Sequence, residues 1–573
     1  MNDIRLFFSC LSGILLSTAL LSGQPSEQTA TAPAPSGKSP RIVNIINFVR
    51  LIEPRTPAPK DPAEGLYQTT VKQLELINRY HLPTTYLLQY DALIAPRYQE
   101  LFKEQLQEGS EIGGWWEITQ PHVEAAGMQW RGRYPWDWHA NIGFATGYTP
   151  QEREKLVDIY MEKFKEVFGR YPASVGSWFI DAHTLKYMVD KYHITASCNC
   201  RDQVGTDGYT LWGGYWNQGY YPSRKNAYMP AQDTTGQIGV PVFRMLGSDP
   251  VYQYESGDGV ASGLRTLEPG CSSGGGKPAW CEWFFKVMTE DPCLNYNYIQ
   301  VGQENAFTWP GVREGFEFQI PLVDSLRKAG AIRVETLGET GRWYKKHFDV
   351  TPPTSVSALS GYEPADARTV WYDSRFYRTN LYWEENGRTF RIRDLHLFNE
   401  EFASDYLTEP GTSTECIYKT LPVIDGFAWS RHKSLMAGYR LVVLDGAGRR
   451  VEISGREPIV TEPDAQSVQV EWPLNDGLGS FLVILKEDRM EIGYKPENPE
   501  MTWMLEFTCN PEAELPLTAI TPKTLKAQTQ GFTYAMNCLQ GTFAGNRDGD
   551  PDCRYRILPA NNKIVLLTDT RKR

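Results

Sequence analysis

The sequence predicts a parallel β/α barrel followed by an all-β, sandwich-like domain. Through residues 41–350, short apolar runs typical of buried strands alternate with helical patterns, which is the order of a parallel sheet built from repeated strand-helix units. An acidic residue follows one apolar run after another. Beyond Thr351-Pro352-Pro353 the helical periodicity fades, and short alternating strands continue to Arg573. We therefore expect a barrel domain at 41–350 and a β-sandwich domain at 351–573.

The barrel elements can be placed by their apolar patterns. The expected strands are short apolar runs bounded by polar or turn residues, and they cover 42–49, 84–89, 111–118, 175–180, 194–200, 241–246, 298–302 and 332–337. The expected helices between them cover 67–80, 98–106, 182–192 and 315–329. A further helix should begin after Thr149, because Pro150 and Glu152 complete a capping pattern, and should end at Gly169.

The N-terminus has the pattern of an export signal. Arg5 precedes an apolar run that ends at Ser22 and Gly23, which is typical of a signal peptide at 1–23. Residues 24–40 are rich in Ser, Thr, Ala and Pro and are expected to form a disordered linker. No later stretch is long and apolar enough to cross a membrane. We therefore expect an exported protein, periplasmic or extracellular, without a transmembrane segment.

The composition argues against one class of partner and favours another. The formal net charge is −11, whereas nucleic-acid binding selects for basic surfaces. Aromatic residues make up 13% of the chain, with 17 Trp and 31 Tyr. Such rings can stack on the apolar faces of sugars, although they also fill large cores. We therefore expect a carbohydrate partner and no nucleic acid, and the oligomeric state stays open.

The cysteines give little support for a metal site. Of ten cysteines, nine remain once Cys10 is removed with the signal peptide, so at least one thiol should be unpaired. Cys271 with Cys281, and Cys538 with Cys553, are close enough in sequence to form disulfides. The paired, closely spaced cysteines of a structural zinc site are absent.

Acidic residues recur where the expected strands end. The carboxyl ends of parallel strands meet at one face of a barrel, so these residues are expected on one rim: Asp91, Glu117, Asp181, Asp202, Asp249 and Glu304. A lone acid of this kind is usually a solvated loop residue or a helix cap. Their recurrence predicts an acidic active face. Arg201, Arg244 and His183 are placed to pair with these carboxylates and to shift their pKa values.

Three motifs carry a resemblance to a known superfamily. They are Asp-Ala-His at 181–183, GTDGYTLWGG at 205–214 and QENAF at 303–307. On these motifs the region from about Arg41 to Tyr344 resembles an exported bacterial family, largely of unknown function, in the glycoside hydrolase/deacetylase barrel superfamily. The resemblance implies a deacetylase-like parallel barrel of about seven strands. It also implies one of two reactions, deacetylation or glycosidic cleavage.

The deacetylase reaction of this superfamily requires two histidines four residues apart after a Glu-Ile-Gly strand, because neutral imidazoles hold the catalytic metal. Here Glu111-Ile112-Gly113 is followed by Trp115 and Thr119 at those places, and neither side chain can hold the metal in this way. We therefore expect no metal and no other cofactor. A metal-dependent esterase would need a rearranged site, drawn from His122, His139, His183, Asp91 and Asp181.

Glycosidic cleavage needs two carboxyl groups that face each other across the sugar, one as nucleophile or base and one as acid. The resemblance to amylopullulanase-type enzymes implies a nucleophile after the fourth strand and an acid/base after the seventh. Counting the expected strands makes Asp181 the nucleophile, with Asp202 or Asp207 as alternatives, and Glu304 the acid/base. The nucleophile of those enzymes is Glu, so the stereochemical outcome stays open.

The expected substrate-binding residues lie on the same rim and in the loop 205–228. Rings in this loop can stack on sugars and its polar groups can bind hydroxyls, although packing within the protein explains any single ring equally well. The set is Asp91, Glu117, His183, Asp202, Asp207, Tyr209, Trp212, Tyr215, Trp216, Arg224 and Arg244. Further candidates to extend this wall are Trp115, Trp116, Trp136, Trp138 and Trp309.

The sequence therefore predicts an exported glycoside hydrolase that cleaves a polysaccharide or oligosaccharide with Asp181 and Glu304. Two alternatives stay open: a metal-dependent carbohydrate esterase, and a non-catalytic glycan-binding protein that would tolerate the loss of both acids. The β-sandwich is expected to pack against the barrel and build its rim. Asp425 within it is expected to be a turn residue. The sugar, the linkage and endo or exo action stay open.

Overall fold

The computed structural model describes residues 39–51, 62–252, 265–362, 367–384, 389–431, 435–546 and 552–571. The expected signal peptide and nearly all of the expected linker lie outside these ranges. The described residues belong to one compact unit. No helix within them is long and apolar enough to cross a membrane.

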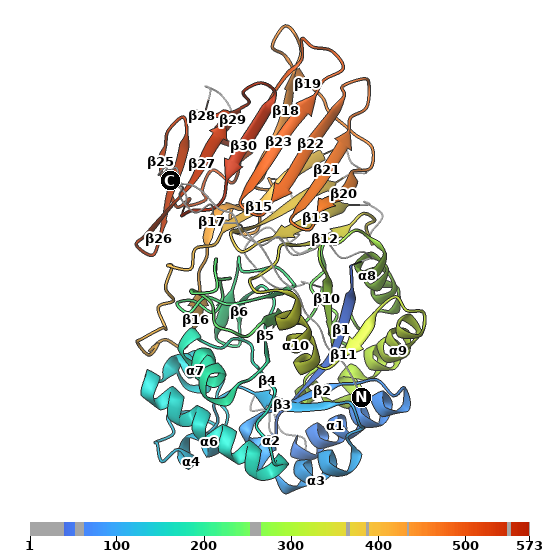
Figure 1. The fold of residues 1–573 in the computed structure, drawn as a ribbon, viewed down its shortest axis with the longest axis vertical. Helices are drawn as coiled ribbons and strands as arrows, with labels where there is room; N and C mark the ends of the chain where they lie inside the picture. The colour runs from blue at the N-terminus through green and yellow to red at the C-terminus, as the bar shows by residue number, and fades with distance from the viewer. Residues whose placement is uncertain are drawn as a thin grey trace, which may run out of the picture. The chain divides into compact units, whose positions relative to one another are not determined.

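A nearly closed, barrel-like sheet forms the N-terminal part of this unit (Figure 1). Its strands run in the order β10-β1-β2-β3-β4-β5-β9-β8, with β11 beside β1. Neighbours pair in parallel, except that β8 is antiparallel to β9. The bounds are β1 Arg41–Val49, β2 Thr85–Leu88, β3 Glu111–Trp115, β4 Ser174–Gly176, β5 Ala196–Asn199, β8 Gly219–Tyr220, β9 Val242–Arg244, β10 Asn297–Val301 and β11 Arg333–Glu335.

These strands confirm the mixed α/β class and the positions of the expected apolar runs. The largest difference is β4, which ends at Gly176 instead of continuing to Ile180. The helices are α1 Pro62–Arg79, α2 Tyr90–Ile94, α3 Pro96–Gln105, α4 Gln120–Ala125, α5 Ala140–Gly143, α6 Pro150–Phe168, α7 Ala182–Tyr192, α8 Pro278–Glu290, α9 Thr308–Lys328 and α10 Leu337–His347.

Helix α6 shows why the local sequence was informative. Thr149 and Glu152 form the expected capping box, in which each side chain binds the other's backbone N–H. Pro150 occupies the first turn, where its missing N–H costs no hydrogen bond. Gly169 ends the helix with φ of 75°, a left-handed conformation that glycine adopts without strain.

Side chains join the two ends of the barrel-like sheet. The amide of Gln218, beside β8, accepts from the backbone N–H of Tyr298 at 2.8 Å and donates to Oδ1 of Asn297 at 2.9 Å. The hydroxyl of Tyr296 accepts from the backbone N–H of Gly219 at 2.9 Å and donates to its carbonyl at 2.9 Å. These contacts hold β10 opposite β8, so the carboxyl ends of the parallel strands surround one face.

From β12 onward the chain forms antiparallel sheets. One sheet has the order β12-β13-β14-β15-β18-β24-β29-β28, and another has the order β20-β21-β22-β23-β30-β27-β26-β25. In the first, β17 Leu421–Asp425 pairs with β15 and β19 Arg450–Val451 with β18. Its other bounds are β12 Thr354–Ala358, β13 Arg368–Asp373, β14 Tyr377–Glu384, β15 Thr389–Leu397, β18 Gly438–Leu444, β24 Thr502–Thr508, β28 Thr542–Gly545 and β29 Cys553–Leu558.

The second antiparallel sheet contains short alternating strands of the kind expected beyond Pro353, and β21 and β22 show this alternation most clearly in their burial. Their inward-facing apolar side chains share one core with those of the first sheet, as in a sandwich. The bounds are β20 Ile459–Asp464, β21 Ser467–Pro473, β22 Ser480–Lys486, β23 Arg489–Lys495, β25 Leu517–Ile520, β26 Thr524–Thr529, β27 Phe532–Gln540 and β30 Lys563–Leu567.

The C-terminal part also adds a strand to a small sheet in the loop on the barrel rim. Strand β16 Cys416–Tyr418 pairs in parallel with β7 Tyr209–Leu211, and β7 pairs with β6 Gln203–Thr206. The backbone of β7 is therefore held on both sides. This pairing fixes the position of part of the aromatic loop that the sequence marked as a substrate wall.

A buried charge network joins the sandwich to the barrel. Arg378 on β14 lies 2.5 Å from Asp202 of the barrel and 2.9 Å from Asp394 on β15. Asp202 also binds Arg244 at 2.8 Å. Beside this network, the ring of Trp216 stacks on Trp371 at 4.3 Å between centroids. The expected packing of the sandwich against the barrel is thus present in these contacts.

The expected disulfides are not formed. Cys271, Cys281 and Cys538 carry free thiols. The thiol of Cys281, on α8, donates to the carbonyl of Gly275 at 3.3 Å, while Cys271 lies near the hydroxyl of Ser273. Closeness in sequence was therefore a poor guide, because a disulfide also requires matching Cβ directions.

Replacing Arg378 with Met should destabilise the protein strongly, because it leaves Asp202 and Asp394 buried with one cationic partner fewer. The expected loss in the free energy of unfolding is about 3–5 kcal/mol, measured by urea denaturation. The matched control is Arg449→Met, which removes an arginine whose side chain is 80% exposed beside Asp445 and should change stability by less than about 1 kcal/mol. Equal effects of the two variants would contradict this role.

Candidate functional site

A buried arginine lies at the centre of the strand-end face. Arg50 directly follows β1 and is 2% exposed. Its Nε and Nη2 donate to the two carboxylate oxygens of Glu117 at 2.9 and 2.6 Å, and its Nη1 lies 2.6 Å from Oε2 of Glu304. Glu117 follows β3 and Glu304 follows β10, so one guanidinium ties three strand ends together. Arg50, Gln89, Asp91, Glu117 and Glu304 are called the Arg50 cluster below.

Neighbouring polar groups fix the orientation of this arginine. The amide of Gln89, after β2, donates to Oε2 of Glu117 at 2.7 Å. Asn305 accepts from the backbone N–H of Arg50 at 3.0 Å and donates to its carbonyl at 2.8 Å. The ring of Trp136 covers the guanidinium at 4.4 Å from its centroid, a cation–π contact. The charged groups are therefore held in one geometry.

Asp91 is the member of the cluster with a perturbed acidity. It lies in the first turn of α2, is 1% exposed and accepts a hydrogen bond from the hydroxyl of Thr119. Burial raises the pKa of Asp91 to about 6; the hydrogen bond from Thr119 opposes this rise and the negative charge of Glu117 adds to it. A carboxyl group of this kind can exchange a proton near neutral pH.

Asp181, the expected nucleophile, has a different environment. It is the N-cap of α7 and accepts from the backbone N–H and the hydroxyl of Thr184 at 3.0 and 2.6 Å. Nη1 of Arg153, from α6, donates to it at 2.9 Å. These contacts give Asp181 a clear structural role in joining α6 to α7. Of the expected catalytic pair, Glu304 lies in the Arg50 cluster.

Most rings of the expected substrate wall are buried against the sandwich. Trp212 donates from Nε1 to Asp425 at 3.0 Å, and the hydroxyl of Tyr215 donates to the carbonyl of Pro352 at 2.8 Å. Trp216 is 1% exposed in its stack on Trp371. Their aromatic faces contact other parts of the protein, which agrees with the alternative expectation that these rings serve in packing. Asp425 also accepts two backbone N–H groups in a turn, as expected.

The remaining expected residues lie in separate environments. Asp202 and Arg244 pair with each other in the network at the sandwich. His183 is part-exposed and lies 3.0 Å from Glu154, and Arg224 donates to the carbonyl of Gln237 at 2.9 Å. Asp207 and Tyr209 line a groove on the rim.

This rim groove has a volume of about 670 Å³. Its rings are Tyr134, Trp138 and Tyr209, and Tyr134 is 47% exposed. Charged side chains line it as well: Arg133, Asp207 and Glu415. Arg133, Tyr134 and Glu415 were not among the expected site residues. No local pattern places Glu415 here, because the pairing of β16 with β7 brings it to the barrel rim.

One aromatic ring separates the rim groove from the Arg50 cluster. Tyr209 lines the groove and stacks on Trp178 with centroids 6.2 Å apart. Trp178 also lies against Arg50, whose guanidinium carbon is 6.0 Å from the ring centroid. The groove and the cluster are therefore connected through the packed rings of Tyr209 and Trp178.

The residues of this face do not fit a catalytic metal. Trp115 and Thr119 occupy the places of the metal-binding histidines; Trp115 stacks on Phe48 at 4.2 Å and Thr119 binds Asp91. Burial lowers the pKa of His122 to about 4, and its ring stacks on Tyr90. Among the described residues no group of three or more His, Cys, Asp or Glu could hold a metal ion.

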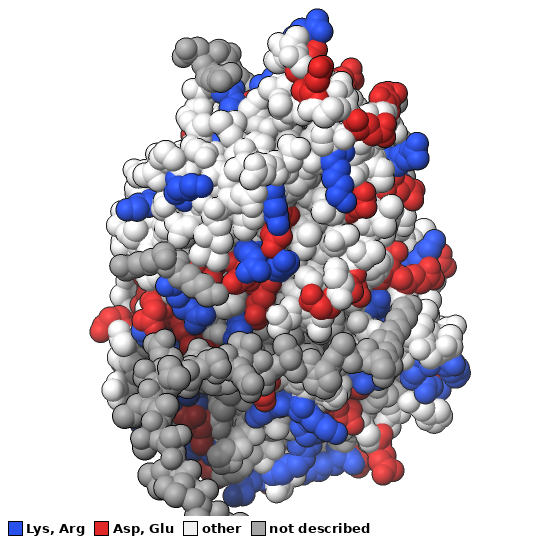
Figure 2. Space-filling model, turned by 45° about the horizontal axis from the view of Figure 1, so that its top comes forward, with Lys and Arg blue, Asp and Glu red and all other residues white. Residues whose placement is uncertain are grey.

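The surface charge is mixed. Figure 2 shows acidic and basic side chains interspersed over much of the face it presents. With a net charge of −11, this distribution does not indicate nucleic-acid binding.

The raised pKa of Asp91 predicts a pH dependence of stability. The folded pKa of about 6 lies above the ordinary value of 3.8, so the stabilisation by the protonated carboxyl is complete below about pH 4. It is lost as the pH rises through 6, and the loss is on the order of 3 kcal/mol.

Asp91→Asn should remove this loss, so the variant gains stability relative to the wild type between pH 4 and pH 7. Urea denaturation across this range measures the difference. The control is Asp349→Asn, at an exposed position. A constant difference between wild type and Asp91→Asn at all pH values would contradict the assignment.

Comparisons with known proteins give a partial structural likeness. No protein-family model matches the chain, and no curated protein matches it. A structure from Parabacteroides distasonis, named as a proposed glycoside hydrolase/deacetylase, is 13% identical with a TM-score of 0.49; the match covers 67% of this chain and 91% of that one.

Two further solved structures are named as proposed polysaccharide deacetylases. The one from Mycobacterium smegmatis is 13% identical, with a TM-score of 0.34, and the match covers 56% of this chain and 95% of that one. The one from Pseudomonas aeruginosa PAO1 is 14% identical, with a TM-score of 0.34, and the match covers 56% and 96%.

Proposed function

We propose that the chain is a carbohydrate-active hydrolase that uses the Arg50 cluster for proton transfer. The observation that carries this proposal is that two carboxyl groups of the cluster, those of Asp91 and Glu117, have different surroundings. Asp91 is buried with a pKa raised to about 6, whereas Glu117 beside it is held in a bidentate ion pair by Arg50. Acid–base catalysis requires such a division between a proton donor and an ionised partner.

Asp91 is the proposed general acid of this site. It can release its proton near neutral pH to the oxygen of a leaving group. Glu304, which Arg50 holds at the end of β10, is the proposed base or nucleophile. This revises the expected pair. Glu304 stays in it but changes from acid/base to base or nucleophile, and Asp91 takes the acid role. The oxygens of Asp181, the expected nucleophile, bind Arg153 and Thr184.

The rim groove supplies the proposed substrate site. Tyr134 and Trp138 can stack on the apolar faces of sugars, and Asp207 and Glu415 can accept hydrogen bonds from hydroxyls. Its volume of about 670 Å³ lies within the usual range for small-molecule sites, about 300–1,000 Å³. Binding there would place a glycan against Tyr209, whose ring packs on Trp178 beside Arg50.

Two hydrolytic reactions fit a carbohydrate substrate. One is cleavage of a glycosidic bond, for which Asp91 and Glu304 would supply the two carboxyl groups. Removal of an acyl group is the reaction that the names of the similar structures favour, although TM-scores of 0.34 to 0.49 do not decide the reaction. Acyl removal here would have to proceed without the paired histidines, because Trp115 and Thr119 replace them.

The test is a panel of plain and acetylated glycans on which reducing ends and acetate are measured in parallel, with and without a strong chelator. Asp91→Asn and Glu304→Gln should each lower turnover by about 10²–10⁴-fold. Release of reducing ends identifies the glycosidic reaction, and release of acetate alone identifies the acyl reaction. Loss of activity with the chelator would overturn a metal-independent site.

Asp181→Asn is the matched comparison. It removes the negative charge from the buried ion pair with Arg153 and weakens the cap of α7, so it should lower stability by about 3–5 kcal/mol while turnover per folded molecule stays close to wild type. The proposal fails if Asp181→Asn abolishes turnover and Asp91→Asn does not. If no glycan is cleaved but glycans bind, the non-catalytic binding alternative replaces it.

A further inference from the structure

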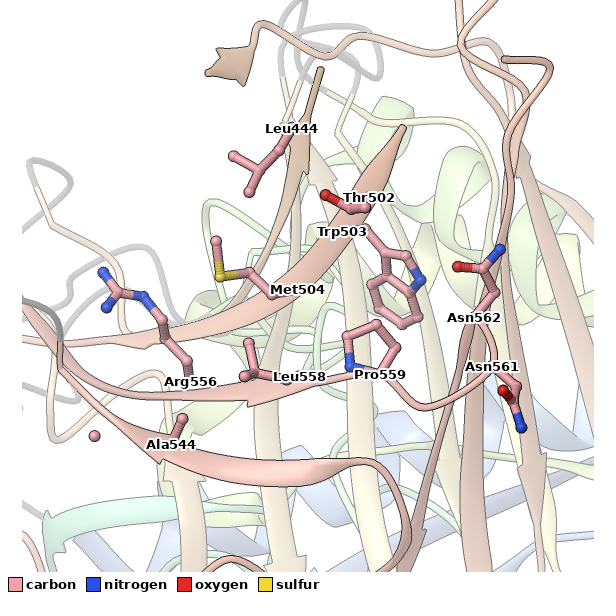
Figure 3. A pocket seen from close by; sticks show the side chains of 11 residues that line it. Leu444, Thr502, Trp503, Met504, Ala544, Arg556, Leu558, Pro559, Asn561 and Asn562 are labelled. Atoms are coloured by element: carbon pink, nitrogen blue, oxygen red, sulfur yellow. The ribbon is translucent and has the colours of Figure 1, made fainter. Parts of the chain in front are cut away.

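A second cavity lies on the sandwich, away from the barrel face. Its volume is about 530 Å³, and strands β18, β24, β28 and β29 form it together with the turn before β30 (Figure 3). The lining residues are Leu444, Thr502, Trp503, Met504, Ala544, Gly545, Arg556, Leu558, Pro559, Asn561 and Asn562. Nothing in the barrel chemistry explains this cavity.

The cavity combines an apolar middle with two polar ends. Figure 3 shows Met504 and Leu558 between the end formed by Arg556 and the end formed by Trp503 and Asn562. Leu558 is 39% exposed, so an apolar side chain is left open to solvent there. Asn561 and Asn562 are exposed and have φ of 52° and 56°. A ligand in this cavity can contact an apolar surface and hydrogen-bond groups at once.

Two buried donors of the lining have no hydrogen-bond partner among the described residues. They are Nη1 of Arg556 and Nε1 of Trp503, and these side chains are 6% and 3% exposed. A buried polar group usually has a partner, because leaving it without one costs about 1–3 kcal/mol. Both groups are donors, so the missing partner must offer acceptor oxygens.

The charge at the arginine end is positive. Glu506, next to Arg556 on the neighbouring strand, is fully buried and accepts from Nε of Arg556 at 2.9 Å and from Arg450 at 2.8 Å. Arg440 lies 3.9 Å from the same carboxylate, so three guanidinium groups share one negative charge and the group as a whole is positive. An acceptor that carries a negative charge suits this end better than a neutral one.

We propose that this cavity binds a carboxylate-bearing sugar unit of a glycan, such as a uronic acid. Its carboxylate accepts from Arg556, its hydroxyls bind Thr502, Asn561 and Asn562, and the apolar face of its ring contacts Met504 and Leu558. The site is separate from the hydrolytic site, and it gives the sandwich a binding role of its own. It does not depend on the reaction proposed for the barrel.

Isothermal titration of the full chain with tri-galacturonate, a neutral glucose trisaccharide and decanoate tests the proposal. Tri-galacturonate should bind at least about tenfold more tightly than the neutral sugar. Trp503→Phe, which removes one donor and keeps an aromatic ring, should weaken the binding by about tenfold. Tyr134→Ala, which removes a ring from the rim groove of the barrel, should leave this binding unchanged, which separates this site from the barrel.

Two surface variants distinguish a specific effect on the cavity from a general effect on folding. Leu558→Asp places a negative charge in the cavity and should abolish the binding of tri-galacturonate. Leu539→Asp makes the same change at a position that is 56% exposed on β27 and outside the cavity, and it should bind as the wild type does. The proposal is overturned if the two variants bind equally, if the neutral sugar binds as well, if decanoate alone binds, or if nothing binds.

Discussion

The structure of the barrel face depends on the burial of one guanidinium group. Moving an unpaired charge into a protein interior costs many kcal/mol, so Arg50 requires carboxylate partners in fixed positions. Glu117 and Glu304 supply them from the ends of β3 and β10. The loop after each strand must therefore bring its acid back to the centre of the face. These ion pairs hold the strand-end face in place, and the backbone hydrogen bonds between neighbouring strands hold the sheet itself.

The sequence was informative where the cause of a structure is local. The strands and α6 follow from apolar runs and a capping box, and the chain forms them where expected. Two of the acids expected at strand ends, Glu117 and Glu304, meet at Arg50. Which acids meet depends on contacts between distant segments. Asp181 precedes a helix, and a capping aspartate has the same local pattern as a catalytic one.

Arg50 was missed for a related reason. A single arginine after an apolar strand has no distinctive spacing, and its two acidic partners lie 67 and 254 residues further along the chain. The aromatic loop shows the same limit. Trp212 and Trp216 are suited to stack on a sugar, but the sandwich supplies Asp425 and Trp371, which bind them instead. The composition of a loop shows that aromatic rings are present. It does not show whether a ligand or another part of the protein packs against them.

The structure separates the aromatic and acidic residues into groups with different physical roles. Rings that meet the sandwich are buried and stabilise the joint, while Tyr134 stays exposed on the rim groove. Among the acids, Asp202 is neutralised by two arginines, whereas burial raises the pKa of Asp91 to about 6 against the opposing hydrogen bond from Thr119, and the negative charge of Glu117 adds to the rise. Cationic partners stabilise the charged form of an acid. Within the Arg50 cluster, Glu117 and Glu304 have such a partner in Arg50, and Asp91 has none among its described contacts. This difference selects Asp91 as the proton donor of the cluster and leaves the charged Glu304 to act as base or nucleophile.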